Sequence, residues 1–126
     1  MDLMVITMEI TFIPKHRMIL VRASGEIDHH SAEKIKQVVE KEIKRTSAIN
    51  VAFDFGCVTF MDSSGIGMLI GRYKTVTALG GGMIVFDANE QIQRLMDMSG
   101  LTRLVTVSET LQKGITQMNK IRSVQI

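Results

Sequence analysis

The sequence predicts a single α/β domain in which helices pack on a mixed β-sheet. Short runs of apolar and β-branched residues alternate with segments that repeat apolar residues every three or four positions. A polar turn alone separates the first two β-like runs, whereas a helical segment separates each later pair. Strands joined through helices are parallel neighbours with right-handed crossovers, and a hairpin adds an antiparallel pair. The expected element order is therefore β-β-α-β-α-β-α-β-α.

The first half of the chain contains the expected hairpin, one helix and one strand. Strands are predicted at 8–13 and 18–24, joined by the polar turn 14–17. A helix is predicted over about 31–45, and a strand follows at 49–55. One apolar stripe on this helix is formed by Ala32, Ile35, Val38, Val39 and Ile43.

The second half repeats the alternation of helix and strand. The expected segments are a helix at 63–79, a strand at 83–86, a helix after Asn89, a strand at 103–107 and a helix from Ser108. The buried face of the first of these helices is predicted to consist of Ile66, Leu69, Ile70, Tyr73 and Val76. Gly80–Gly82 and Gly100 follow two of the helices, where glycine commonly ends a helix. Methionine fills irregular gaps, so the ten methionines are interpreted as core packing.

Composition and charge exclude several classes of protein. The 126 residues are 45% hydrophobic and 22% charged, which is typical of one soluble domain. A net charge of +2 is too small for a nucleic-acid-binding face. The N-terminus lacks the features of a signal peptide, and no apolar stretch is long enough to cross a membrane. We therefore expect a cytoplasmic protein that binds neither nucleic acid nor membrane.

The segment Asp62-Ser63-Ser64-Gly65 is the strongest candidate for a functional site. It lies between an apolar run and a helix, so Asp62 or Ser63 can be the N-cap. The simplest interpretation is a helix start alone. The alternative is phosphorylation, because free amides and the dipole at a helix N-terminus favour an anion by about 0.3–1 kcal/mol. A phosphoserine beside Asp62 would then be strongly anionic and would block a contact without melting the helix.

Four motifs, in order, resemble the anti-sigma factor antagonists, a family with the STAS fold. They are Gly-Glu-Ile-Asp-His-His-Ser-Ala at 25–32, Phe-Met-Asp-Ser-Ser-Gly-Ile-Gly at 60–67, Gly-Arg-Tyr-Lys at 71–74 and Leu-Met-Asp-Met-Ser-Gly-Leu at 95–101. The resemblance extends over about residues 8–121 and is strongest to members that act in sporulation. It implies a single STAS domain over 1–126.

The resemblance also implies a partner-switching mechanism. The unphosphorylated protein would bind an ATP- or ADP-bound anti-sigma factor that is also a serine kinase, and would thereby release a sporulation sigma factor. The kinase would phosphorylate Ser63, and a serine phosphatase would restore the hydroxyl. The expected partner-binding residues are Asp28, His29, Asp62, Ser63, Ser64, Gly65 and Ile66. No catalytic residue, metal or cofactor is implied, and we expect a monomer.

Two other functions remain open from the sequence. An antagonist serving a general-stress sigma factor would share the Ser63 switch, but His29-His30 and the motif at 71–74 favour the sporulation type. A metal-dependent phosphoesterase is suggested by Asp28-His29-His30, because a carboxylate and imidazoles can hold a divalent metal. Such sites need further aspartates from other strands, and their motifs are missing. The simpler interpretation of this turn is that Asp28 or Ser31 caps the following helix.

The glycine run Gly80–Gly82 and the single cysteine Cys57 are each interpreted as part of the fold and not as a functional site. Gly80–Gly82 lacks the Lys-Ser/Thr ending of a P-loop and precedes a strand, so it is expected to stop a helix. Cys57 is the only cysteine, so it forms no intramolecular disulfide. No activating partner is visible for it in the sequence, and we expect a small core residue.

Overall fold

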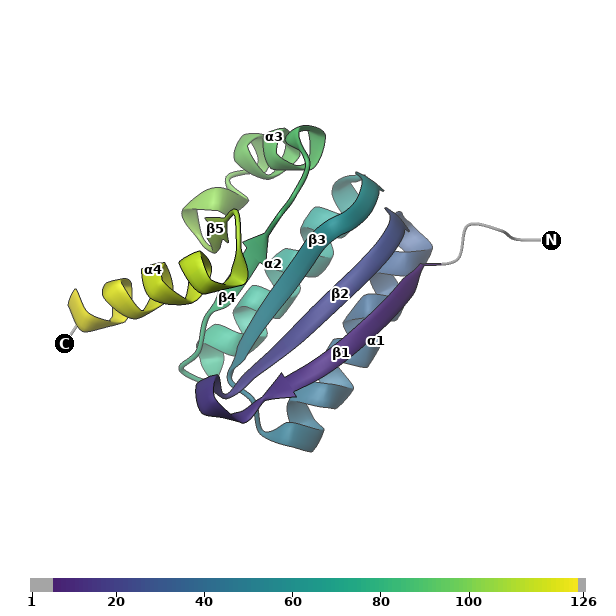
Figure 1. The fold of residues 1–126 in the computed structure, drawn as a ribbon. Coiled ribbons are helices and arrows are strands. Elements are labelled where there is room, and N and C mark those ends of the chain that lie inside the picture. The colour runs from purple at the N-terminus through teal and green to yellow at the C-terminus, as the bar shows by residue number, and fades with distance from the viewer. Residues whose placement is uncertain (1–5, 125–126) are drawn as a thin grey trace.

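The computed structural model describes residues 6–124, and its elements form one mixed five-stranded sheet with helices on both faces (Figure 1). β1 and β2 are antiparallel, and the β2-β3, β3-β4 and β4-β5 pairs are parallel, in the spatial order β1-β2-β3-β4-β5. The predicted fold class and element order are confirmed. The elements are β1 (Thr7–Ile13), η1 (Pro14–His16), β2 (Met18–Ile27), α1 (His29–Thr46), β3 (Asn50–Met61), α2 (Ser63–Ala78), β4 (Met83–Phe86), α3 (Glu90–Ser99), η2 (Leu101–Arg103), β5 (Thr106–Ser108) and α4 (Leu111–Val124).

The helices divide the core into two parts. α1 and α2 lie side by side on one face of the sheet, and α4 crosses the other face over β4 and β5 (Figure 1). The larger core lies under α1 and α2 and includes the fully buried Ile35, Phe53 and Leu69. The smaller core lies under α4 and includes Ile84 and Ile115. Apolar packing against the sheet therefore holds α2 along its length and fixes the position of its N-terminus.

Several element boundaries differ from the prediction. β2 and β3 run on to Ile27 and Met61, several residues further than expected. The strand predicted at 103–107 is wrong at its start, because residues 101–103 form a 3₁₀ turn after the left-handed Gly100 (φ 82°) and β5 begins only at Thr106. α4 begins at Leu111 and not at Ser108, because Ser108 still pairs with Phe86 in the sheet.

Cys57 is exposed, so its prediction as a core residue is wrong. β4 pairs only with residues 51–54 of β3, and the rest of β3 has a strand neighbour on one side alone. Register shifts between β2 and β3 on both sides of this position further interrupt the regular alternation of inward and outward side chains. The apolar appearance of the β3 sequence therefore did not indicate which of its positions face water.

The three glycines after α2 end the helix, as predicted. α2 ends at Ala78, and Gly80 adopts a left-handed conformation with φ 85°. The Gly81 amide donates to the Val76 carbonyl at 2.8 Å. A Cβ at Gly81 would lie 1.6 Å from the backbone oxygen of Ile49, so the chain passes this point too closely for any side chain.

Candidate functional site

The register of β2 and β3 places the two candidate turns next to each other. Ile27 and Met61 are partners in the parallel pair, and the Asp62 amide donates to the Ile27 carbonyl at 3.1 Å. The following residues, Asp28 and Asp62, are the N-caps of α1 and α2. Two helix N-termini with free amides and two acidic caps thus meet at one edge of the sheet. The Asp28 turn therefore lies beside the Ser63 segment.

Asp62, and not Ser63, caps α2. Its backbone is extended (φ −103°, ψ −171°), and its Oδ1 accepts a hydrogen bond from the Ser64 amide at 2.8 Å. Ser63 is therefore the first residue of the helix, and its side chain is not required for capping. A change at Ser63 leaves the cap intact.

The two serines of this segment differ in exposure. Ser63 is exposed, and its hydroxyl makes no hydrogen bond within the described part of the chain. Ser64 is half-buried and faces the groove between α1 and α2. A phosphoryl donor can reach the Ser63 hydroxyl more readily than that of Ser64. The sequence alone does not reveal this difference between two adjacent serines.

Gly65 and Ile66 lie below this surface and are buried. A Cβ at Gly65 would lie 2.2 Å from Cγ of Met61 and 3.1 Å from a methyl of Ile27, so glycine is required here by internal packing. Gly65 therefore does not serve to leave room for another molecule at the helix start. Both residues position the helix, and direct partner contact is expected from the other five candidates.

The Asp28 turn is a reciprocal capping box. Asp28 Oδ1 accepts from the Ser31 amide at 2.9 Å, and the Asp28 amide donates to Ser31 Oγ at 2.9 Å. Ser31 Oγ also donates to the Glu26 carbonyl at 2.9 Å. Asp28 and Ser31 thus share the role that the sequence assigned to one or the other. Among the described residues, no group of three or more His, Cys, Asp or Glu side chains lies close enough to hold a metal.

The capping box makes Asp28 an acid-sensitive element of the fold. Hydrogen bonds from the Ser31 amide and then the Ser31 hydroxyl lower the pKa of Asp28 below its ordinary value of 3.8. Because the pKa of Asp28 is lower in the folded state than in the unfolded state, its carboxylate stabilises the protein at any pH above the unfolded-state pKa. This stabilisation is lost as the pH falls from there through the folded-state pKa. At pH 7 we expect Asp28→Ala to lower the melting temperature by a few degrees. Asp28→Asn keeps a capping oxygen but loses the charge, so its melting temperature should fall between those of the wild type and Asp28→Ala.

Thermal melts between pH 7 and pH 3 check this prediction. The difference in melting temperature between wild type and Asp28→Ala should begin to shrink as the pH falls below the ordinary value of 3.8. A difference that stays constant over this range would show that the carboxylate charge of Asp28 contributes nothing.

A groove of about 290 Å³ runs between α1 and α2 from these two N-termini. Its lining residues are His29, Ala32, Glu33, Lys36, Ser64, Gly67, Met68, Gly71 and Arg72. Gly67 and Gly71 lie one turn apart in the interior of α2, where each costs about 1 kcal/mol relative to alanine. Apart from the adjacent residues and the nearby backbone of α2 itself, no described atom lies within 4 Å of a Cβ built at either position. Unlike Gly65, these two glycines have no packing requirement inside the protein.

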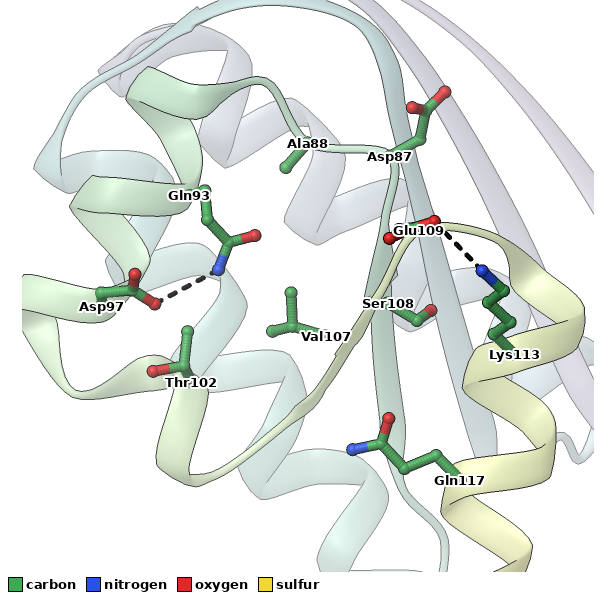
Figure 2. Close-up of a pocket in the computed structure, with 10 residues that line it drawn as sticks. All are labelled: Asp87, Ala88, Gln93, Asp97, Thr102, Val107, Ser108, Glu109, Lys113 and Gln117. Atoms are coloured by element: carbon green, nitrogen blue, oxygen red, sulfur yellow. Dashed lines mark hydrogen bonds and ion pairs between the residues drawn. The ribbon is translucent and has the colours of Figure 1, made fainter.

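A larger hollow, about 530 Å³, lies at the carboxyl ends of β4 and β5, beside α3 and α4 (Figure 2). Gln93 donates to Asp97 at 3.2 Å, and Lys113 pairs with Glu109 at 3.1 Å. No candidate residue from the sequence lines this hollow. Its polar side chains are either paired or open to solvent, so their arrangement does not define a reaction or a ligand.

The chain belongs to the STAS domain family, whose model matches residues 7–114. It is 35% identical over 107 residues to the anti-sigma F factor antagonist of Paenibacillus polymyxa, covering 84% of this chain and 92% of that protein. It is 28% identical over 97 residues to the anti-sigma-B factor antagonist of Bacillus subtilis (strain 168), covering 77% and 87%.

Solved structures show the same fold. The anti-sigma factor antagonist SpoIIAA in its unphosphorylated form aligns with a TM-score of 0.76 at 24% identity, covering 90% of this chain and 97% of that one. The phosphorylated form of SpoIIAA from Bacillus aligns with a TM-score of 0.68 at 24% identity, covering 88% and 98%. In the described part of the chain, no helix has the length and hydrophobicity needed to cross a membrane.

Proposed function

We propose that this protein is an anti-sigma factor antagonist of the sporulation type. In its unphosphorylated form it binds an anti-sigma factor that is also a serine kinase, and the sigma factor is released. Phosphorylation of Ser63 ends this binding, and a serine phosphatase restores it. The relative named anti-sigma F factor antagonist, at 35% identity over most of both chains, supports this proposal. The single structural observation that carries it is the exposed Ser63 at the first position of α2, beside the N-terminus of α1.

The geometry accounts for a switch that acts by charge. The cap of α2 is formed by Asp62, so a phosphate on Ser63 does not remove a hydrogen bond that holds the helix. The free amides and dipole at the helix N-terminus tolerate the added anion. A partner that packs on Ser63 would have to desolvate a phosphate next to the carboxylate of Asp62, and that cost disfavours the complex.

In this proposal the chain is a regulatory protein and not an enzyme. The phosphoryl-transfer machinery and its nucleotide belong to the kinase, and this chain supplies the acceptor hydroxyl. We also propose that the protein acts as a monomer in the cytoplasm and that Asp28, His29, Asp62 and Ser64 surround the acceptor within the partner contact.

An antagonist of a general-stress sigma factor is the second candidate, because relatives named anti-sigma-B factor antagonists match at 27–28% identity. The higher identity to the anti-sigma F antagonist favours the sporulation type.

The first test identifies the acceptor. The full chain is incubated with the anti-sigma factor kinase and ATP, and phosphopeptides are mapped by mass spectrometry. We expect one phosphate, on Ser63, because its hydroxyl is exposed whereas Ser64 is half-buried. Ser63→Ala should remain unmodified and Ser64→Ala should still be modified. A phosphate on Ser64 of the wild-type protein, or none at all, would contradict the proposal.

A further inference from the structure

The groove between α1 and α2 has features that the fold itself does not explain. Gly67 and Gly71 weaken α2 relative to alanine, yet an added Cβ would meet no described atom at either position. Glycines in a helix interior without a packing role indicate a close approach of another backbone. The positions lie on the same face of the helix and line the groove together with Ser64.

Arg72 supplies an independent observation in the same groove. The residue is only 6% exposed, and its Nε lies 2.7 Å from Glu40 Oε1. This contact is an ion pair without hydrogen-bond alignment, since neither Nε nor Nη1 has a hydrogen-bond partner among the described residues. A buried N–H group without an acceptor is costly and uncommon in folded proteins. Because Nε and Nη1 are themselves buried, an acceptor brought into the groove by another molecule can reach Arg72 only at Nη2, the guanidinium nitrogen that is not among these buried atoms.

The charges along the groove favour binding of an acidic segment. Lys36 lines it from α1 and has no ion pair within the described residues, whereas Arg72 lines it from α2 and is paired with Glu40 on one side of its guanidinium. Glu33 is the one carboxylate among the lining residues, and His29 stands at the end nearest the two N-termini. A carboxylate arriving between Lys36 and Arg72 would gain charge-assisted hydrogen bonds.

We propose that this groove docks a segment of the anti-sigma kinase that lies against Gly67 and Gly71 and carries a carboxylate to Lys36 and Arg72. The proposal rests on the proposed function and adds a second contact to the one at Ser63. From Ser64 to Arg72 the groove follows eight residues of helix, about 12 Å at 1.5 Å each. That length accommodates about four extended residues at 3.3 Å each. The groove is continuous with the Ser63 surface, so one partner can cover both.

The test measures the affinity of the full chain for the anti-sigma kinase by calorimetry, with two matched pairs of variants. Gly71→Gln fills the groove with a good helix former, and Ala78→Gln places the same side chain at an exposed position of α2 outside it. Lys36→Glu reverses a charge inside the groove, and Lys34→Glu reverses one on the exposed side of α1. Melting temperatures of all four variants show whether the fold is kept.

We expect Gly71→Gln and Lys36→Glu each to weaken binding by about tenfold or more, while both controls bind as wild type does. Wild-type affinity of Gly71→Gln would overturn docking in the groove, and wild-type affinity of Lys36→Glu would overturn the acidic character of the docked segment. If the wild-type chain itself does not bind the anti-sigma kinase, the proposed function fails. If the wild-type chain binds and the groove variants bind equally well, only the docking proposal fails.

Discussion

Ser63→Asp is expected to weaken binding to the anti-sigma partner strongly while leaving the protein folded. Ser63 is exposed at the first position of α2, and its side chain takes no part in the cap. The helix N-terminus tolerates the new carboxylate, but an interface that covers Ser63 would bury it unpaired beside Asp62. Such a charge costs about 2–5 kcal/mol, and each 1.4 kcal/mol is a factor of ten in affinity. The loss should therefore be roughly thirtyfold to several-thousandfold.

Calorimetry and circular dichroism check this prediction together. Ser63→Ala is the matched control and should bind like the unphosphorylated wild type, because alanine adds no charge. Ser63→Asp with wild-type affinity would show that charge at this position does not act as the switch. A loss of binding accompanied by a loss of helical signal would show that the effect comes from unfolding.

Leu69→Ala is expected to cost about 2–5 kcal/mol of the free energy of unfolding. Leu69 is 0% exposed in the larger core and holds α2 against the sheet, six residues after the proposed acceptor. A typical domain has about 5–15 kcal/mol in total, so this change alone can bring the protein close to unfolding. Urea denaturation measures the effect.

Leu79→Ala is the matched control, because it deletes the same atoms at the end of the same helix where the side chain is 48% exposed. Its cost should be within about 0.5 kcal/mol. Equal losses for Leu69→Ala and Leu79→Ala would contradict the account in which apolar packing under α2 positions Ser63.

The sequence predicts the elements of this fold well wherever apolar periodicity is strong. The stripe of α1 and the alternation of strands and helices lead directly to the observed order, because a helix between two strands makes them parallel neighbours. The boundaries near β5 were missed because three residues suffice for that strand, and the 3₁₀ turn before it leaves no periodic pattern. Cys57 was misplaced because exposure along β3 depends on where β4 stops pairing.

The sequence identifies the candidate segment but not the surroundings of its residues. The segment around Ser63 stands out in the sequence because a polar cap, two hydroxyls and a glycine occur together at the start of a helix. Which serine is exposed, and which glycine is required by packing, depends on contacts with Met61 and Ile27 from neighbouring strands. The groove between α1 and α2 could not be predicted at all, since it exists only where two helices, distant in sequence, lie side by side.

The central claim is that phosphorylation of Ser63 controls release of a sigma factor. The most direct measurement titrates the complex of anti-sigma kinase and sigma factor with this protein, before and after enzymatic phosphorylation, and follows free sigma factor by size-exclusion chromatography. We predict that the unphosphorylated protein displaces the sigma factor and that the protein phosphorylated on Ser63 does not. Equal displacement by both forms, or displacement by neither, would contradict the account.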